Sequence, residues 1–432
     1  MIDVQDLIDF FLLRDPNVRW VVLGIMLMSA ASAVVGVFAY LRKRALVGDA
    51  VSHAILPGVC VAFLVTGIKN PWILLGGAFL SGYFSLWCIN LISKHSRIKP
   101  DTAIALILSV FYGVGILLLT SIQNSGNANQ SGLDKFLFGK AAALVYDDVL
   151  VFSFFGVLLI LVVMLLFIPF KVMAFDRDFA QSSGLPVNAL DTVLSVMTVL
   201  AITIGIQTVG VVLMAALLIT PAASARYWTH NLRIMVILAA AIGAFSGILG
   251  AFVSYEWAKM PTGPWVVTFL SLIAVVSVLF GTHKGVWAKL RQLHRNRLKM
   301  LEENILKCFY HLGEQDHSFT IARSLEEIQE KRLFELRQLK KGLKRLTRKK
   351  LLLLHADKYA LTDQGMEEGK RVTRIHRLWE LYLTKHLHLA SDHVHEDAEA
   401  IEHIITPEIE RELEVHLNFP RTDPHQTPIP YK

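Results

Sequence analysis

Long apolar segments dominate the first 283 residues and constrain the fold more than any other feature. A helix needs about 20 residues to cross the ~30 Å hydrocarbon core of a membrane. Since lipid offers no partner to backbone polar groups, such a chain folds as a bundle of helices. We therefore expect an all-α polytopic membrane domain with eight or nine transmembrane helices. The nine candidate segments are 18–41, 45–67, 71–93, 101–122, 147–170, 187–204, 206–225, 233–255 and 264–282.

Charged residues are concentrated in the remaining third of the chain. Residues 284–432 hold 27 of the 43 Lys and Arg, 23 of the 36 Asp and Glu, and 12 of the 16 His. This part is expected to be a separate soluble unit, so the net charge of +7 averages two unlike halves. We expect an extracytoplasmic segment at 1–17, a membrane domain at 18–283 and a basic cytoplasmic linker at 284–297.

Lys and Arg in the short loops predict the orientation of the membrane domain. With nine crossings and the N-terminus outside, the inner loops carry ten of these residues and the outer loops carry four. The charged third then lies in the cytoplasm, whereas eight or ten crossings would place it outside. The first residues show no basic stretch with a small-residue cleavage site, so we expect no removed signal peptide.

An acid and an imidazole interrupt the second apolar segment. In "VGDAVSHAILPG", Asp49 and His53 stand four residues apart and share one face of a helix. A carboxylate at mid-membrane costs about 2.5–3.5 kcal/mol even on the lenient insertion scale, so it usually faces a cavity or a partner. Carboxylate oxygen and imidazole nitrogen together suit Mn, Fe or Zn. The residues alone leave two interpretations open, a metal site or a polar pair near Arg42 at the inner interface.

The expected inner loop 174–187 has the signals of a short helix. In "AFDRDFAQSSGLPV", Asp176 is suited to begin the helix and Gly184 to end it, with Pro186 beyond. Composition alone allows a solvated connector as readily as a functional element.

The charged third begins helical at Leu298 and contains a basic helix near 335–350. "LLLLHADKYALTDQG" then reads as strand, turn and strand, with Thr362 capping the next helix. Helix, basic helix and two-stranded ribbon follow the order of a winged helix-turn-helix. A basic amphipathic helix could instead lie on anionic lipid, but the ribbon favours the winged helix. The basic side chains expected to meet duplex DNA are Arg337, Lys340, Lys341, Lys344 and Arg345.

Histidines and acids recur at helical spacing further on. "HRLWE" places His376 and Glu380 four residues apart, and "VHEDAEAIEH" places two imidazoles and two carboxylates on one helix face. Such a set indicates a divalent-metal site, and the alternative is a solvated acidic helix rich in His. The four residues of the second motif are His395, Glu399, Glu402 and His403.

Three motifs in the membrane part resemble the permeases of zinc/manganese/iron-type ABC importers. They are "GDAVSHAILPGVCVAFL", "FDRDFAQSSGLPV" and "LLITPAASAR", in this order. The resemblance implies a type II importer fold in a bacterial inner (plasma) membrane, with Asp49 and His53 lining the translocation path. It implies three partners: a cytoplasmic ABC ATPase, an extracytoplasmic metal-binding lipoprotein, and a second permease subunit, identical or related.

The same resemblance makes the segment 175–187 the helix that docks on the ATPase. The residues implied in coupling are Asp176, Phe179, Ala180 and Gly184. The sequence has no G-x-x-x-x-G-K-[ST] motif, so ATP hydrolysis is expected in a separate subunit and this chain is not expected to be an enzyme.

The region from Leu298 to Pro430 resembles the metal-dependent repressors of the diphtheria-toxin-repressor family. The resemblance implies a winged-helix domain at 298–371 and a metal-binding and dimerisation domain at 372–432. Glu399 stands where the manganese-responsive members have Glu rather than Cys, and carboxylate suits Mn²⁺. The implied metal ligands are His376, Glu380, His395, Glu399, Glu402 and His403.

Two positions depart from the repressor pattern. The family takes further ligands, a Met or Asp and, in the manganese type, a Glu, from its first helix. Aligning "ENILKCFY" with that helix puts Asn304 and Lys307 at these positions. Asn304 can offer an oxygen, whereas a Lys ammonium has no lone pair to give.

Taken together, the sequence predicts a permease subunit of an ATP-driven divalent-metal importer with a fused metal-sensing domain. Mn²⁺ is the favoured ion, and Fe²⁺ and Zn²⁺ are the alternatives. The competing hypothesis is a metal-dependent transcriptional repressor, tethered to the membrane or released by proteolysis in the basic stretch 290–300.

Overall fold

The structure, a computed structural model, describes residues 9–10, 12–42, 45–68, 70–124, 146–257, 260–386 and 405–431. It divides into two compact units, Met1–Ala288 and Lys289–Lys432, which are described separately below. The expected soluble third therefore forms a unit of its own. Most of the stretch 284–297, expected as a linker, is helical and forms the beginning of α14.

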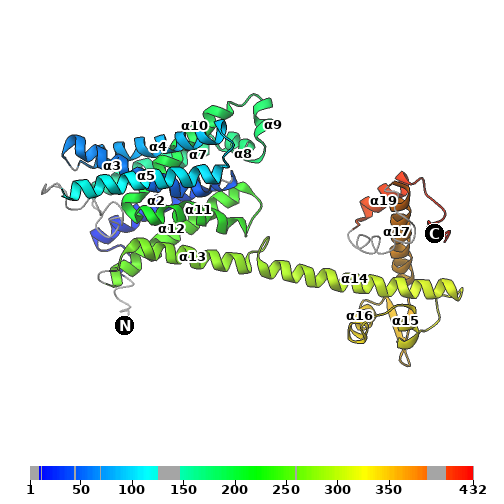
Figure 1. Cartoon of the computed structure of the whole chain (residues 1–432). Helices are drawn as coiled ribbons and strands as arrows, with labels where there is room; N and C mark the ends of the chain where they lie inside the picture. The colour runs from blue at the N-terminus through cyan, green and yellow to red at the C-terminus, as the bar shows by residue number, and fades with distance from the viewer. Residues whose placement is uncertain are drawn as a thin grey trace. The chain divides into compact units, whose positions relative to one another are not determined.

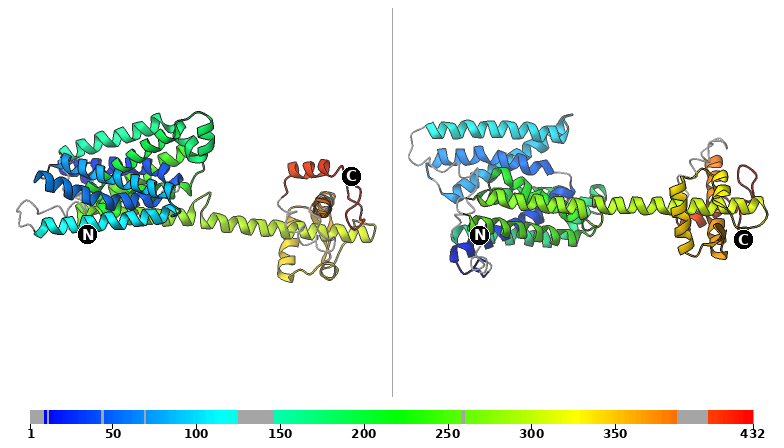
Figure 2. Two further views of the ribbon diagram at one scale, coloured as in Figure 1. Left: turned by 45° about the horizontal axis from the view of Figure 1, so that its top comes forward. Right: turned by 90° about the horizontal axis from the view of Figure 1, so that it is seen from below.

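The first unit is a bundle of helices that lie side by side (Figures 1 and 2). The expected segment 147–170 is divided between two of them, α7 and α8. The helices are α2 (Pro16–Leu41), α3 (Ala45–Thr66), α4 (Pro71–His95), α5 (Pro100–Asn124), α7 (Tyr146–Leu165), α8 (Phe167–Phe175), α9 (Arg177–Ser182), α10 (Val187–Val209), α11 (Val211–Arg226), α12 (Leu232–Glu256) and α13 (Thr262–Phe280).

Among the described residues, eight helices are long and apolar enough to cross a membrane. They correspond to eight of the nine expected segments, which confirms the polytopic all-α fold. The ninth, expected at 206–225, is α11, whose 16 residues are fewer than a straight crossing requires.

The chain reverses direction between α10 and α11 at Gly210. This glycine has φ 91°, a backbone conformation that side chains with a Cβ rarely adopt. α10 starts beside the end of α2, where Asp191 pairs with Arg42. α11 then runs back along α2, so that the carbonyl of Leu218 lies against Gly36. The two helices therefore form an antiparallel pair, and both ends of this pair lie on the same side of the bundle.

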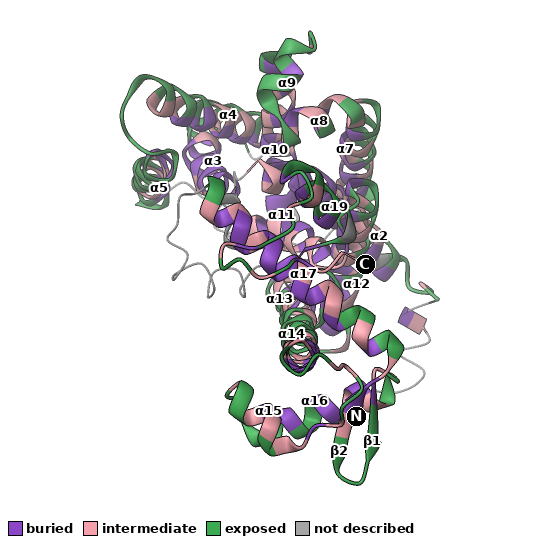
Figure 3. Ribbon diagram, turned by 90° about the vertical axis from the view of Figure 1, so that its right-hand side faces the viewer, coloured by how far each residue is buried: buried purple, intermediate pink, exposed green. Residues whose placement is uncertain are grey.

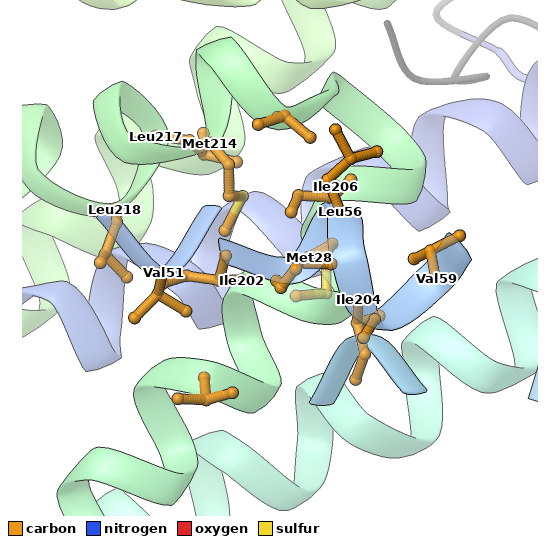
Figure 4. Close-up of a cluster of buried hydrophobic side chains, with 14 of the residues drawn as sticks. Met28, Val51, Leu56, Val59, Ile202, Ile204, Ile206, Met214, Leu217 and Leu218 are labelled. Atoms are coloured by element: carbon orange, nitrogen blue, oxygen red, sulfur yellow. The ribbon is translucent and has the colours of Figure 1, made fainter. Parts of the chain in front are cut away.

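The core of the bundle gathers around α3, most of whose residues are buried. Val51 and Leu56 of α3 meet Ile202 of α10 and Met214 of α11 (Figure 4). These side chains are 3% exposed or less. Outward-facing positions of the same bundle are also apolar, as expected for a surface in contact with lipid tails rather than water. Examples are Leu80, Leu117, Met164, Leu165 and Ile237.

The second unit combines two helical clusters with one β-hairpin. β1 and β2 pair antiparallel in the register Leu352↔Leu361 to His355↔Lys358, and the hairpin projects beside α15 and α16 (Figure 3). The elements are α14 (Val286–Gln315), α15 (Leu325–Lys331), α16 (Leu336–Arg348), β1 (Leu352–His355), β2 (Lys358–Leu361), α17 (Asp363–His386) and α19 (Pro407–His416).

The order of these elements is that of a winged helix-turn-helix. The hydroxyl of Thr362 accepts a hydrogen bond from the backbone N–H of Gly365 at 2.9 Å, so the expected cap of α17 is confirmed. Leu339, Leu343 and Leu346 of α16 are buried against α14 and β1, leaving the basic side chains on the outer face. The expected basic helix near 335–350 and the ribbon after it are therefore present.

A second apolar cluster joins α17 to α19 and the last described residues. It is formed by Leu378 and Leu381 of α17 with Leu413, Leu417 and Ile429. Ion pairs surround it, because Glu410 accepts from Arg371 at 3.1 Å and from Arg374 at 2.5 Å. Buried carboxylates of this kind require such partners.

We predict that the contact between α3 and α4 depends on glycine at position 77. A Cβ at Gly77 would lie 2.5 Å from the carbonyl oxygen of Gly58, whereas a Cβ at Gly76 would meet nothing within 4 Å. Gly77→Val should therefore lower the thermal stability of the purified protein and its yield in membranes, and Gly76→Val should leave both close to wild type. Equal melting temperatures of the two variants, measured in detergent, would contradict this packing.

Candidate functional site

Asp49 and His53 lie on one face of α3, as their spacing predicted. Nε2 of His53 is 3.5 Å from Oδ1 of Asp49, and the side chains are 19% and 44% exposed, respectively. The pair therefore opens to the surface of the unit, while the other face of α3 is packed in the core (Figure 4).

One ring nitrogen of His53 is buried without a hydrogen bond to any of the described residues. Within the described residues, its Nδ1 atom is inaccessible to solvent and makes no hydrogen bond. Its ring meets Tyr112 of α5 edge-on, with 4.9 Å between centroids. Arg42, which the sequence offered as a neighbour for Asp49, pairs with Asp191. The sequence also offered Lys43 and Arg44 as neighbours of Asp49, and these two lie outside the described residues.

Two donors do not complete a metal site. The described part of the chain contains no group of three or more His, Cys, Asp and Glu side chains placed to hold an ion. An ion passing Asp49 and His53 would take its other ligands from water or from another subunit.

The short helix expected in the loop 174–187 is α9. Oδ1 of Asp176 accepts from the backbone N–H of Phe179 at 2.9 Å and caps its start. Gly184 follows the helix with φ 81°, in the left-handed region that glycine tolerates. Ala180 is fully buried, whereas the Phe179 ring is 60% exposed. Phe179 is thus a large apolar side chain that is exposed on α9.

Asp191 connects this short helix to the rest of the bundle. Its carboxylate pairs with Arg177 of α9 at 3.0 Å and with Arg42 at the end of α2. The pair with Arg42 is shielded, because the two side chains are 8% and 16% exposed, whereas the side chain of Arg177 is 47% exposed. Sequence reasoning missed this residue, although an acid close to the start of a predicted span was a usable signal.

In the second unit, His376 and Glu380 lie on α17 at the predicted spacing and are nearly fully buried. Nε2 of His376 is 3.1 Å from Oε1 of Glu380. The other ring nitrogen, Nδ1, is 3.4 Å from the ammonium of Lys307 on α14. The exposed fractions of the three residues are 2%, 3% and 2%.

The remaining predicted ligands have a different status. His395, Glu399, Glu402 and His403 lie outside the described residues. Asn304 lies on α14, where its Oδ1 accepts from Arg332 at 3.4 Å. Of the predicted sensor ligands, the structure therefore brings together His376 and Glu380.

A cavity of about 410 Å³ adjoins His376 and Glu380. Its carboxylates already have cationic or backbone partners, since Glu314 accepts two bonds from Arg377 at 2.9 and 2.6 Å. Burial lowers the pKa of His311, which also lines the cavity, to about 3, and the positive charges of Arg377 and Lys307 contribute. The cavity therefore combines cations with carboxylates, since Lys331 and Arg377 line it together with Glu314, Glu380 and Asp423.

Four of the five basic side chains predicted to meet DNA are exposed on α16. These are Arg337, Lys340, Lys341 and Lys344. Arg345 differs, because its Nε donates to Oε1 of the buried Glu302 at 2.6 Å. It helps to hold α16 on α14 and is less accessible to a ligand than its neighbours.

Comparison with known proteins decides the class of the membrane part. A profile of the ABC 3 transport family matches residues 14–281, more than half of the chain. The chain belongs to this family. A second profile, "Iron dependent repressor, metal binding and dimerisation domain", matches residues 362–431 of the permease. Both resemblances inferred from the motifs are confirmed.

Two relatives carry names from metal transport. The permease is 40% identical over 381 residues to "Manganese transport system membrane protein MntC" of Bacillus subtilis (strain 168), covering 88% of this chain and 87% of that protein. It is 41% identical over 292 residues to "Zinc transport system membrane protein TroC" of Treponema pallidum (strain Nichols), covering 68% of this chain and 97% of that protein. The longer match extends beyond the first unit, which ends at Ala288.

A solved structure supports the fold of the membrane unit. "PsaBC from Streptococcus pneumoniae in complex with Fab" is similar with a TM-score of 0.58 and 28% identity, over 67% of this chain and 99% of that one. The chain is thus an ABC-type permease with a fused domain of the metal-dependent repressor type.

Proposed function

We propose that this chain is the membrane permease of an ATP-driven importer of divalent transition metals. Mn²⁺ is the favoured ion, with Zn²⁺ and Fe²⁺ as alternatives. The observation that carries the proposal is the Asp49–His53 pair, whose carboxylate oxygen Oδ1 and imidazole nitrogen Nε2 lie 3.5 Å apart, with the side chain of Asp49 44% exposed. Oxygen and nitrogen donors in this combination suit these ions. The names of the manganese and zinc relatives support the same class of cargo.

A second permease subunit, a copy of this chain or a related one, would cover the open side of the pair. The side chain of Asp49 is 44% exposed on an isolated unit. Facing lipid would cost this carboxylate about 2.5–3.5 kcal/mol, so the open side should face water or protein. A path between two subunits meets this requirement and doubles the donors available to one ion.

The energy for transport would come from a separate cytoplasmic ABC ATPase docked on α9. Phe179 is the docking side chain, since it is large, apolar and 60% exposed. Asp191 would transmit the movement of α9, because it pairs with both Arg177 and Arg42. An extracytoplasmic lipoprotein would deliver the ion to the opposite side.

If the ATPase docks on α9, the second unit should lie in the cytoplasm. The side of the membrane on which α9 lies would face the ATPase. α10 begins on this side and α11 ends on it. α12 and α13 form the next pair, so the chain should leave the membrane on the side of α9. The excess of Lys and Arg in the inner loops agrees with this orientation in a bacterial inner membrane.

The second unit is proposed to sense the imported ion. His395, Glu399, Glu402 and His403 supply the donor set, in which carboxylates favour Mn²⁺. The ion would be read out through the winged helix, either on duplex DNA or on the permease itself. The alternative of a repressor that is tethered, or released by proteolysis, uses the same DNA surface.

Removal of both path donors should abolish uptake. We expect Asp49→Ala with His53→Ala to lower Mn²⁺ uptake by about tenfold or more, since one contact to a charged group is worth about 1.5–3 kcal/mol. Uptake of radioactive Mn²⁺ would be measured in cells that lack other importers, with the permease quantified in membranes. The control is His95→Ala with Asp101→Ala, an exposed imidazole and acid on neighbouring helices. Uptake at the wild-type rate in the Asp49/His53 variant would exclude these residues from the path.

Two further variants should distinguish docking of the ATPase on α9 from transmission of its movement to the membrane helices. Phe179→Ala should reduce co-purification of the ATPase, because the apolar contact is lost. Asp191→Asn should keep the ATPase bound but lower the uptake achieved for each ATP hydrolysed. Phe154→Ala is the control, an exposed aromatic on α7 away from α9. If Phe179→Ala binds the ATPase as wild type does, α9 is not the docking helix.

The DNA surface is tested with the full chain in detergent, with and without Mn²⁺, on a pool of duplex promoter DNA. Lys340→Glu with Lys344→Glu should weaken binding and reduce the salt slope by about two, since each lost phosphate contact removes about one. Lys385→Glu with Arg411→Glu makes the same charge change on α17 and α19 and should have little effect. Absence of any DNA binding at low salt would leave regulation of transport as the role of the domain.

A further inference from the structure

Lys307 stands where the repressor-type pattern calls for a metal ligand, and its surroundings are unusual. It is 2% exposed, and lysine is rarely buried to this extent without partners. Its ammonium lies 3.4 Å from Nδ1 of His376, which is itself 3.1 Å, through Nε2, from Glu380. Three side chains from two helices thus form a buried row of cation, imidazole and carboxylate.

The donor and acceptor capacities of the three groups determine which nitrogen of His376 carries the ring proton. An ammonium group can only donate, so Nδ1 of His376 is the acceptor and carries no proton. The neutral ring then bears its proton on Nε2 and donates it to the carboxylate of Glu380. Both ring nitrogens are engaged, and a metal ion can bind an imidazole only through a nitrogen lone pair. In this arrangement, His376 has none to offer.

A second position on α14 also lies close to a cation of the protein. Asn304, three residues before Lys307, accepts from the guanidinium of Arg332. That guanidinium also lies over the ring of Phe334, at 5.6 Å from its centroid. Both positions where the repressor pattern takes ligands from its first helix are therefore close to a protein cation.

We propose that the ammonium of Lys307 is a built-in cation that takes the place of a metal ion between α14 and α17. Its contact with His376 joins α14 to α17 without an ion, so this contact between the two helices does not depend on metal. His376 and Glu380, which the sequence assigned as ligands, are then positioning residues of the native chain. This inference rests on the proposed sensor function and limits its metal response to the segment that contains Glu399, Glu402 and His403.

Metal counting on the full chain in detergent tests the proposal. The protein is dialysed against Mn²⁺ alone, and bound metal is measured by mass spectrometry. His376→Gln should bind as many ions as wild type. Lys307→Glu should bind one more ion, because a carboxylate replaces the ammonium and the lone pair on Nδ1 of His376 becomes available to the metal. The added ion should be lost again in Lys307→Glu with His376→Gln.

Two further variants keep the result interpretable. Lys299→Glu, the same change two turns earlier on α14, should add no ion. Lys307→Met covers the case in which Lys307→Glu fails to fold, and it should bind Mn²⁺ more weakly but still through His376. Loss of an ion in His376→Gln alone would overturn the proposal, as would the same ion count in wild type, Lys307→Glu and Lys307→Met.

A separate experiment tests the sensor function on which the inference rests. Glu402→Ala with His403→Ala should remove an ion from wild type if the segment binds metal. If it removes none while Lys307→Glu still gains one, the sensor proposal is wrong and the built-in cation stands.

Discussion

The absence of water inside the bilayer is the constraint on which the membrane unit depends. Every backbone polar group there needs a partner within the protein, which makes continuous helices the rule and each break an exception that must be satisfied locally. The reversal at Gly210 meets this requirement, because its backbone N–H still donates to Ile206 and the returning helix packs against α2. The Asp49–His53 pair raises the same requirement for polar side chains. A half-exposed carboxylate and an unpartnered ring nitrogen are stable in a membrane protein only where water, a subunit or an ion meets them.

The same low dielectric gives Asp191 its importance. An acid that pairs with Arg177 and Arg42 ties a surface helix of six residues to the end of a long one. The next residues in sequence after α2 begin α3, which carries Asp49. In the proposed coupling, a force applied at Phe179 would therefore have a short route to the helix that carries Asp49. Ion pairs at an exposed surface contribute little, but a shielded pair between two elements resists their separation.

Sequence reasoning recovered what periodicity and local chemistry determine. Apolar length located eight spans, Asp176 and Gly184 marked α9, and Thr362 marked the start of α17, because caps and spans depend on nearby residues only. It predicted a crossing at 206–225 directly after 187–204, which agrees with the reversal at Gly210, but it did not foresee that α11 has only 16 residues. Nor could it pair Asp191 with Arg42 or Lys307 with His376, because these contacts join residues far apart in the sequence. Lys307 drew attention as a departure from the repressor pattern, but its contact with His376 came from the packing of α14 on α17.

The two ion-handling regions face opposite physical demands. A path must release its ion, so two donors with an open side and exchangeable water suit it better than a closed cage. A sensor must bind its ion long enough to change a contact, which requires a complete donor set and a movable element. A fixed ammonium beside His376 removes one such element, because the contact of α14 with α17 is already made without metal. In the proposed sensor, a metal response would then depend on the predicted ligands after α17, and its size would be limited by the difference in metal affinity between the two states of the protein.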